Sequence, residues 1–355
     1  MIYLDNIIFS LQRAGGISVV WAEHLMRILK AKQDVRFFDY ANGAENIFRR
    51  NIDIPADKIL YGRKIPMSLE RYLNPRLSGK AQGIFHSSYF RTVNNPDMKN
   101  ITTVHDFTYE YYASGIKKFI HCKQKYDAIR NSDAIICISE NTKKDLLKFL
   151  PDINPLKIHV VYNGVSEDFC QLTNIAAENI HPYEPGNYLL FVGARTGYKN
   201  FIKMVECLKG SNENLLIVGG GEISNQEKEL LDSYIGAPHY RWVGRIDNTK
   251  LNLLYNQAKC LVYPSAYEGF GIPPLEAQKA GCPVIALNTS SLPEVMADSG
   301  ILLGDLTTEN FNNAFSLLAS PAERKNLIEA GINNSKRFSW DLTFEQTMEV
   351  YNTLM

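Results

Sequence analysis

Short apolar segments alternate with amphipathic segments along the chain, and this alternation most constrains the fold. The apolar segments are of strand length and nearly continuous, which indicates parallel strands buried on both faces. In the first half we expect strands over residues 1–9, 35–40, 83–87, 101–105, 134–139 and 158–162. Helices are expected over 17–30, 115–131 and 140–150. Strands that alternate with helices are typical of an α/β fold with a parallel sheet.

A second series follows a break in the pattern. Asn163-Gly164 is a turn sequence, and residues 166–187 carry Pro182, Pro185 and Gly186 with little periodicity, which is typical of a linker. Further apolar strands are expected over 188–192, 214–218, 240–243, 260–263 and 283–287. The sequence therefore predicts two Rossmann-like, doubly wound α/β domains that face a cleft. They cover residues 1–165 and 188–339, on either side of a linker over 166–187.

Composition narrows the class of protein. Lys+Arg and Asp+Glu both number 38, and this zero net charge disfavours a nucleic-acid binder. None of the six cysteines forms a C-x-x-C pair, which favours buried free thiols in a reducing compartment. The N-terminus lacks a signal-peptide pattern, and no stretch approaches the ~20 apolar residues of a membrane span. We expect a cytoplasmic protein whose membrane contact, if any, is peripheral at the inner face.

The strongest local motif lies at residues 263–277. It runs from an apolar strand through Gly269 and Gly271 into a helix whose first turn holds Pro273 and Pro274. Glycine lets the backbone approach a ligand closely, and proline is tolerated in the first helical turn because its missing amide has no helical partner there. The backbone amides at this helix start form an expected anion site, made by Phe270, Gly271 and Ile272.

Two carboxylates flank this turn. Carboxylates accept paired hydrogen bonds from vicinal hydroxyls, so Glu276 is expected to hold a ribose diol and Glu268 the hydroxyls of a sugar that is transferred. The alternative is a surface loop and an exposed helix charge. A matching basic element follows an earlier strand, with Gly193 in the turn and Arg195 and Lys199 beside it. Two cations suit a diphosphate leaving group, whereas the alternative is a pair of solvated surface cations.

Three further glycine loops are weaker signals. Gly219-Gly220-Gly221 and Val243-Gly244 each follow a strand and would lie beside a nucleotide if the sheet order is the usual one. In the first half, Gly15-Gly16 opens a helix, but it lacks the full dinucleotide or P-loop spacing. Glycine loops after strands are also ordinary structural turns.

His105 ends the strand expected over 101–105, where a catalytic or sugar-contacting imidazole would reach a ligand. The alternative is a structural histidine. Asp106 either orients His105 or caps the next segment. Ser139 is expected to be a helix N-cap rather than a substrate contact.

Taken together, these elements resemble the GT-B retaining glycosyltransferases, specifically glycosyltransferase family 4. The likeness covers nearly the whole chain and includes residues 161–165 before the linker. It implies a C-terminal domain that binds a nucleoside-diphosphate sugar and an N-terminal domain that binds the acceptor. It also implies retention at the anomeric carbon, a diphosphate held by Arg195 and Lys199, and His105 on the other side of the donor sugar from Glu268. A final helix within 340–355 is expected to pack back on the first domain.

The resemblance leaves the substrates partly open. No Asp-x-Asp occurs in the chain, so no metal and no further cofactor are expected. By analogy the donor is GDP-mannose, while UDP-glucose and UDP-N-acetylglucosamine remain alternatives. The acceptor is expected to be a glycan or lipid-linked saccharide of bacterial-type surface polysaccharide synthesis. The basic segment over residues 49–72 either faces such an acceptor at a membrane or is a solvated loop.

Two rival functions remain. A nucleotide-sugar epimerase can share this two-domain fold, but it needs acid and base carboxylates at the sugar ring, which the sequence does not reveal. A non-catalytic carbohydrate-binding protein on the same fold would have no need of Glu268, Arg195 and Lys199.

Overall fold

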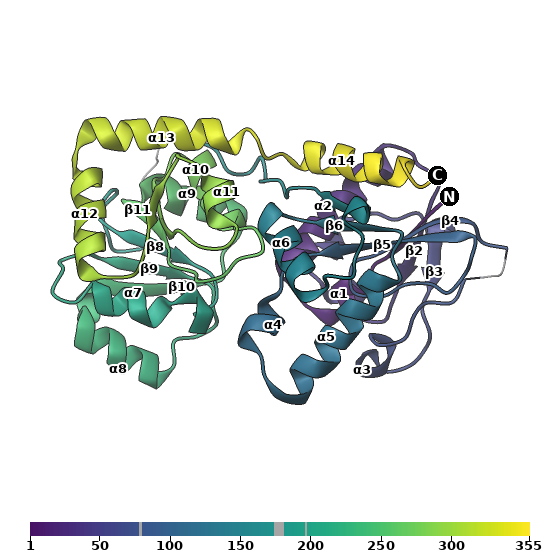
Figure 1. Cartoon of the computed structure of the whole chain (residues 1–355). Helices are drawn as coiled ribbons and strands as arrows, with labels where there is room; N and C mark the ends of the chain where they lie inside the picture. The colour runs from purple at the N-terminus through teal and green to yellow at the C-terminus, as the bar shows by residue number, and fades with distance from the viewer. Residues whose placement is uncertain (78–79, 174–180, 196) are drawn as a thin grey trace. The chain divides into compact units, whose positions relative to one another are not determined.

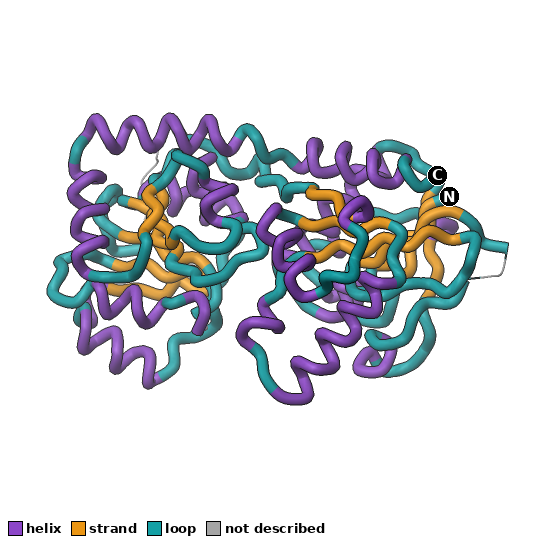
Figure 2. The backbone as a smooth tube through the Cα atoms, in the orientation of Figure 1, coloured by secondary structure: helices purple, strands orange, loops and turns teal. Residues whose placement is uncertain are grey.

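The computed structural model describes residues 1–77, 80–173, 181–195 and 197–355. The chain divides into two compact units. Unit 1 comprises Met1–Gly164 and Trp340–Met355, and unit 2 comprises Val165–Ser339. In each unit a parallel sheet lies among helices (Figures 1 and 2). Both units are Rossmann-like α/β domains, which confirms the predicted fold class.

The sheet of unit 1 has the strand order β3-β2-β1-β4-β5-β6-β7. Its strands are β1 (Ile2–Asp5), β2 (Val35–Asp39), β3 (Ile59–Tyr61), β4 (Gly83–Ser87), β5 (Met98–Val104), β6 (Ala134–Cys137) and β7 (Ile158–Val160). Its helices are α1 (Ile8–Leu11), α2 (Gly16–Lys30), α3 (Met67–Glu70), α4 (Thr108–Tyr112), α5 (Gly115–Arg130), α6 (Glu140–Phe149) and α14 (Trp340–Asn352). Short 3-10 turns cover Gly43–Glu45, Arg49–Asn51, Ala56–Lys58 and Pro155–Lys157.

The first strand is shorter than predicted. β1 ends at Asp5, and the apolar residues Ile8 and Phe9 belong to α1. The Ile8 amide donates to the Ser88 hydroxyl at 3.0 Å, which starts the helix where the ladder stops. Both apolar side chains are buried, and a short buried apolar run does not by itself distinguish a strand from a helix.

The sheet of unit 2 has the order β10-β9-β8-β11-β12-β13. Its strands are β8 (Leu189–Val192), β9 (Leu215–Val218), β10 (Tyr240–Gly244), β11 (Cys260–Tyr263), β12 (Val284–Leu287) and β13 (Ile301–Leu303). Its helices are α7 (Phe201–Cys207), α8 (Asn225–Tyr234), α9 (Asn248–Gln257), α10 (Ile272–Lys279), α11 (Leu292–Met296), α12 (Thr308–Ala319) and α13 (Pro321–Ser335). Gly197–Lys199 and Ala237–His239 form 3-10 turns.

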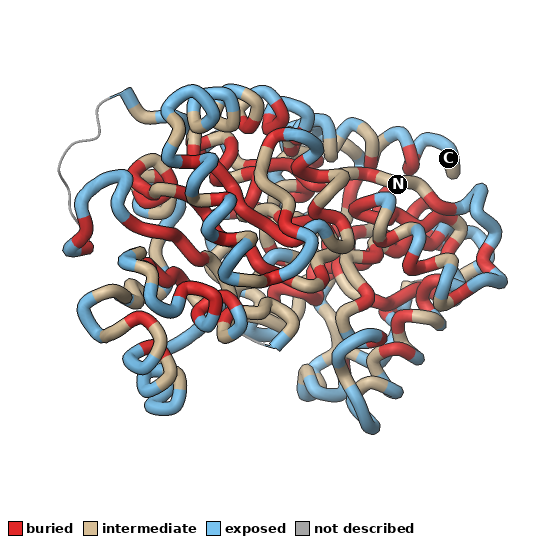
Figure 3. The backbone as a smooth tube through the Cα atoms, turned by 60° about the vertical axis from the view of Figure 1, so that its left-hand side comes forward, coloured by how far each residue is buried: buried red, intermediate tan, exposed pale blue. Residues whose placement is uncertain are grey.

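Every strand pair within both sheets is parallel. The buried residues, red in Figure 3, gather in the inner segments of each unit, and exposed residues lie on outer loops and helices. Because all the strand pairs are parallel, the loops that follow the strands emerge at one edge of each sheet, which we call its carboxyl edge.

The segment predicted as a linker contacts unit 2 in its described parts. The Cys170 amide donates to Asn252 Oδ1 at 3.1 Å, and the Gly186 amide donates to the Gln257 carbonyl at 2.6 Å. Both partners lie on α9. Residues 174–180 lie outside the described part of the chain. Cys170 is exposed, contrary to the expectation of buried thiols, whereas the other five cysteines are buried and free.

The last helix, α14, packs in unit 1 against α2. The Tyr351 hydroxyl lies 2.6 Å from His86 Nδ1 and 3.0 Å from His24 Nε2. Arg27 Nε donates to Asp341 Oδ1 at 2.6 Å. Burial lowers the pKa of His24 to about 4, so this imidazole stays neutral beside the hydroxyl.

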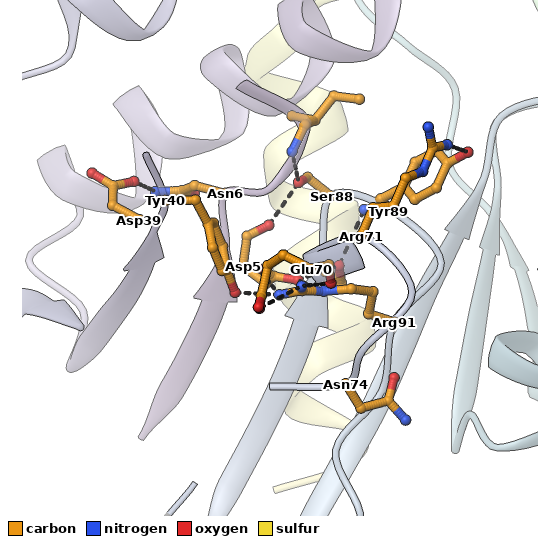
Figure 4. A network of polar contacts seen from close by, with 12 residues as sticks. Asp5, Asn6, Asp39, Tyr40, Glu70, Arg71, Asn74, Ser88, Tyr89 and Arg91 are labelled. Atoms are coloured by element: carbon orange, nitrogen blue, oxygen red, sulfur yellow. Dashed lines mark hydrogen bonds and ion pairs between the residues drawn. The ribbon is translucent and has the colours of Figure 1, made fainter. Parts of the chain in front are cut away.

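A buried ion network fixes the loop after β4 (Figure 4). The Arg91 Nε and Nη2 groups each donate to one oxygen of the Asp5 carboxylate at 2.9 Å, and both side chains are fully buried. Arg91 Nη1 also donates to the Glu70 carbonyl at 3.1 Å. Breaking such a pair costs about 3–5 kcal/mol because one charge is left buried alone. The network therefore holds residues 88–92 firmly against β1.

Candidate active site

The glutamate motif forms a tight turn between β11 and α10. Gly271, the N-cap of α10, has φ +105°, which favours glycine, and a Cβ there would lie 2.9 Å from Leu292 Cδ2. Two serines after β12 fix the turn. The Glu268 amide donates to the Ser290 hydroxyl at 2.9 Å, and the Ser291 hydroxyl lies 2.8 Å from the Phe270 carbonyl. No pattern in the sequence marks either serine as part of this turn.

Lys199 and Glu268 form an ion pair, with Nζ 2.5 Å from Oε1. Both side chains are largely buried, at 15% and 12% exposed. Their loops are tied together at the backbone, because the Ala266 amide donates to the Tyr198 carbonyl at 2.8 Å and Asn200 Nδ2 donates to the Pro264 carbonyl at 3.0 Å. The two loops that the sequence linked only by chemistry therefore meet in the fold.

Glu276 lies half-buried within α10. Burial raises the pKa of Glu276 to about 7, while the Tyr255 hydroxyl, which donates to Oε2 at 3.0 Å, opposes this rise. Tyr255 comes from α9 and is fully buried. The carboxylate is thus held by one donor and has limited contact with water. It is suited to accept hydrogen bonds from a diol, which would offset its lost hydration.

Arg195 takes a position that the sequence did not predict. Its Nε donates to Glu227 Oε1 at 2.8 Å, and its Nη groups donate to the carbonyls of Gly219, Gly221 and Glu222 at 2.9–3.1 Å. The Arg195 side chain is 3% exposed. The hydrogen bond from Arg195 lowers the pKa of Glu227, which also closes the capping box of α8. Arg195 therefore fixes the loop that contains Gly219, Gly220 and Gly221, while Lys199 pairs with Glu268.

The glycine loops of unit 2 adjoin one another. The Gly193 amide donates to the Val218 carbonyl at 3.0 Å, and the Gly219 amide donates to the Gly244 carbonyl at 2.8 Å. All three glycines have positive φ, at +134°, +81° and +73°. Thr196, within the first of these loops, lies outside the described residues. The sequence-predicted residues of this domain all lie at or after the carboxyl ends of strands in one sheet. Val243 and Gly244 are the last residues of β10, and the others follow β8 or β11: Gly193, Arg195, Lys199, Glu268, Gly269, Phe270, Gly271, Ile272 and Glu276.

In unit 1, His105 follows β5 and lines a cavity of about 40 Å³ together with His24, His86 and Trp340. Burial lowers the pKa of His105 to about 4; Asp106 opposes this shift and Lys125 adds to it. The imidazole is therefore neutral near pH 7. Asp106 Oδ1 accepts the amide of Thr108, the first residue of α4, at 2.8 Å, whereas the N-cap position of that helix is Phe107.

Two other predicted features of unit 1 lie at helix starts. Ser139 Oγ accepts the Thr142 amide at 3.0 Å, which confirms the predicted N-cap of α6. α2 begins at Gly16, and Gly15 is extended at φ 173°. The loop before them is held by Asn46, whose Nδ2 donates to the Gln12 carbonyl at 2.8 Å.

Family models match both halves of the chain. The description "Glycosyltransferase Family 4" applies to residues 14–169, and "Glycosyl transferases group 1" applies to residues 175–334. The chain carries two glycosyltransferase-family domains on a GT-B fold.

Relatives of this glycosyltransferase are distant in sequence. It is 23% identical to O-antigen chain mannosyltransferase B of Escherichia coli over 92% of the chain and 91% of the relative. It is 25% identical to O-antigen chain mannosyltransferase RfbU of Salmonella typhimurium over 62% and 61%. Alpha-maltose-1-phosphate synthase of Mycobacterium tuberculosis is 25% identical over 63% and 64%.

Solved structures share the fold of the glycosyltransferase. Sucrose-phosphate synthase from Thermosynechococcus elongatus superposes with a TM-score of 0.79 at 20% identity, over 99% of this chain and 98% of that one. Anabaena HepE, solved in complex with UDP-glucose, gives a TM-score of 0.72 at 13% identity, over 99% of both chains.

The basic segment over 49–72 makes contacts within unit 1 of the glycosyltransferase. Arg49 pairs with Asp39 at 2.7 Å, and Arg63 pairs with Glu70 at 3.4 Å. Arg71 donates to the Tyr89 hydroxyl at 3.1 Å. These arginines are held by partners within unit 1, so they do not form the freely solvated loop that was one of the two predictions, and membrane contact of this segment stays a prediction. In the described part of the chain, none of the helices combines the length and the apolar character that a membrane span requires.

Within the described ranges, no three His, Cys, Asp or Glu side chains gather as a metal-ion site would require.

Proposed function

We propose that the chain is a retaining hexosyltransferase that moves mannose from GDP-mannose to a glycan or lipid-linked acceptor in surface polysaccharide synthesis. The donor is argued from two relatives whose names specify O-antigen mannosyltransferases. Those names describe the relatives, so the donor sugar of this chain requires a direct binding test.

The observation that carries the transferase function is the Lys199–Glu268 ion pair, which lies at the same sheet edge as the half-buried Glu276. In this proposal Glu276 accepts the ribose hydroxyls of the nucleotide. Glu268 and the backbone at Phe270–Ile272, the start of α10, hold the hydroxyls of the donor sugar. Lys199 lies beside the diphosphate, where its charge offsets the negative charge that develops as the glycosidic bond breaks.

Retention follows from a front-face transfer in this proposal. The bond between the anomeric carbon and the diphosphate oxygen breaks, and the acceptor hydroxyl oxygen bonds to the same face of that carbon. The hydroxyl proton passes to the departing diphosphate oxygen. No enzymic nucleophile is needed, and Glu268 acts by positioning the sugar. We propose that Lys199 and the helix start take the place of a metal ion, so activity is expected to survive a chelator.

The remaining assignments rest on the family resemblance. Arg195 is proposed to support the diphosphate, either directly or by fixing the loop that contains Gly219, Gly220 and Gly221. His105, neutral near pH 7, is proposed to accept or donate one hydrogen bond to the donor sugar rather than to supply a positive charge. Gly15 and Gly16 are proposed to let unit 1 approach the donor closely. The peripheral membrane contact is likewise proposed and would bring the chain to a lipid-linked acceptor.

Thermal unfolding in the presence of GDP-, UDP-, ADP- and dTDP-sugars tests the donor. A ligand that binds the folded state raises the midpoint, by an amount set by its concentration relative to the dissociation constant. GDP-mannose is expected to give the largest rise. UDP-glucose is the second candidate because the similarly folded Anabaena protein was solved with it. If no nucleotide sugar moves the midpoint, the transferase proposal fails.

A further inference from the structure

A groove runs along one face of α5 in unit 1, away from the residues assigned above. It consists of two adjoining hollows of about 370 and 520 Å³, which share Asn74, Thr92 and Asn131. One wall is a stripe at helical spacing that includes Phe119 and Gln124 of α5 and Asn131, the C-cap of that helix. From Phe119 to Asn131 this stripe spans about 18 Å at the rise of an α-helix, which is longer than one sugar ring.

The chemistry of the groove changes along its length. At one end lie the exposed rings of Phe119 and Tyr72, which are 67% and 47% exposed. At the other end the lining is rich in amide side chains, with Asn94 and Asn131 both exposed. The ionisable side chains of the lining, Lys123 and Asp127, pair with each other at 2.7 Å. The groove thus offers ring faces and neutral hydrogen-bonding groups.

The wall opposite α5 is held in place before any ligand binds. Phe90 and Thr92 flank Arg91, which the buried ion pair with Asp5 anchors (Figure 4). Asn74 Oδ1 accepts the Thr92 amide at 3.1 Å. Because a preformed wall loses little conformational freedom on binding, it is suited to a weakly held, elongated ligand.

We propose that this groove binds a neutral oligosaccharide, the part of the acceptor glycan beyond its reacting end. Amide groups both donate and accept hydrogen bonds, as sugar hydroxyls do, and aromatic rings cover the apolar faces of sugars. The choice of a saccharide rests on the proposed function. A lipid surface would call for a convex, cationic patch, whereas this groove is hollowed and its charges cancel.

The position of the groove along α5 leads us to expect that affinity depends on the length of the glycan. α5 starts after the carboxyl end of β5, where His105 lies, and returns to the amino end of β6. A glycan in the groove therefore extends from the carboxyl edge of the unit 1 sheet toward its amino edge. Longer glycans fill more of the groove and bind more tightly.

The test uses an array of neutral oligosaccharides, from mono- to hexasaccharides, with the full chain and without nucleotide sugar. Binding is expected to increase with length. For the best array ligand, Phe119→Ala is expected to weaken affinity by about threefold to tenfold, the loss of one stacked ring. Asn131→Ala is expected to weaken it as well. Ile116→Ala is the matched control, because Ile116 is 74% exposed on the same helix but does not line the groove.

Absence of any length-dependent binding overturns the proposal, as does an equal loss in the Phe119→Ala and Ile116→Ala variants. Sedimentation with vesicles that contain phosphatidylglycerol tests a membrane surface instead. If Phe119→Ala abolishes vesicle binding and leaves oligosaccharide binding unchanged, the groove assignment is wrong. The proposed function is tested separately, by whether nucleotide sugars raise the thermal unfolding midpoint of the wild-type chain.

Discussion

Lys199 and Glu268 come from two different loops and form an ion pair. Each side chain therefore holds the other in position in the absence of a ligand. In the proposed function, the Lys199 ammonium group contacts the diphosphate while it remains paired with Glu268. The same ion pair would hold the Glu268 carboxylate in position for the donor sugar. This coupling was invisible in the sequence, where the two residues lie 69 positions apart.

Lys199→Ala is expected to lower kcat by about 100-fold or more, because the charge acts on a leaving group that becomes more negative in the transition state. Lys203→Ala, an exposed lysine of α7, is the matched control and is expected to leave kcat unchanged. Steady-state assays with the donor from the thermal screen provide the measurement. Equal effects of the two substitutions would contradict the role of Lys199.

Protonation of Glu276 is expected to make donor binding depend on pH. Its pKa of about 7 means that acid converts the carboxylate into a neutral acid, which has lost acceptor capacity for the ribose diol. Donor affinity is therefore expected to fall as pH decreases from 8 to 6. Glu276→Gln is expected to weaken binding at pH 8 by roughly 1.5–3 kcal/mol and to flatten the pH profile. Calorimetry at several pH values measures both, and an unchanged affinity would remove the ribose assignment.

The same residue affects stability with the opposite sign. The folded pKa of about 7 exceeds the ordinary glutamate pKa of 4.5, so the folded state binds more protons between these pH values. Stability contributed by this group is present at low pH and is lost as pH rises through 7. Glu276→Gln is thus expected to raise the free energy of unfolding at pH 8 by roughly 1–3 kcal/mol relative to its effect at pH 5. Urea unfolding at the two pH values is the measurement.

At the scale of elements, the turn into α10 depends on one glycine. Gly271→Ala is expected to destabilise the protein by roughly 1–3 kcal/mol, because alanine is strained at φ +105° and its Cβ meets Leu292. Donor affinity is expected to fall with it. Gly304→Ala, where a Cβ meets nothing within 4 Å, serves as the control. If urea midpoints show equal losses for both variants, the turn is not under the constraint described.

Strand positions were predictable where an apolar run is bounded by a glycine or by polar residues. The predicted strands over 83–87 and 260–263 match β4 and β11 residue for residue. The edge strands β3 and β13 were not predicted, because short strands with partly exposed residues carry little apolar signal. The region between β2 and β4 was the least legible part of unit 1.

The candidate site was predictable as a set of loops and not as a set of contacts. Parallel strands bring their following loops to one edge, so Gly193, Lys199 and Glu268 could be grouped from the sequence. The partners of Arg195 could not, because they depend on β9 lying beside β8 in the folded sheet. Tyr255 reaches Glu276 from another helix, and nothing in its sequence context marks it.

At the scale of the whole molecule, unit 1 is built from two separate stretches of chain. Ending the chain at Ser339 would remove α14 and uncover His24 and His86, together with apolar surface that Val350 and Tyr351 bury. At about 1.5–3 kcal/mol for each large apolar side chain, unit 1 is expected to lose roughly 5 kcal/mol of stability. Hydrogen exchange is expected to show faster exchange in β1 and β4 of the truncated chain.

Unit 2 supplies the control in the same experiment. Its sheet lies entirely within Val165–Ser339, so exchange in β8 and β11 is expected to stay unchanged after the truncation. The response of the truncated chain to the donor is also expected to persist, since the proposed nucleotide contacts lie in unit 2. Uniformly faster exchange across both sheets would show that the two units do not unfold separately.

The placement of α14 also affects how the protein is made. A ribosome emits β1 first and Trp340–Asn352 only after all of unit 2. The seven-stranded sheet of unit 1 is therefore synthesised before α14, the helix that places Tyr351 between two histidines. Unit 1 stays incomplete while unit 2 is synthesised and folds. During that interval an incomplete apolar surface of unit 1 is open to chaperones, and a chain that stops before Trp340 would have a complete unit 2 and an incomplete unit 1.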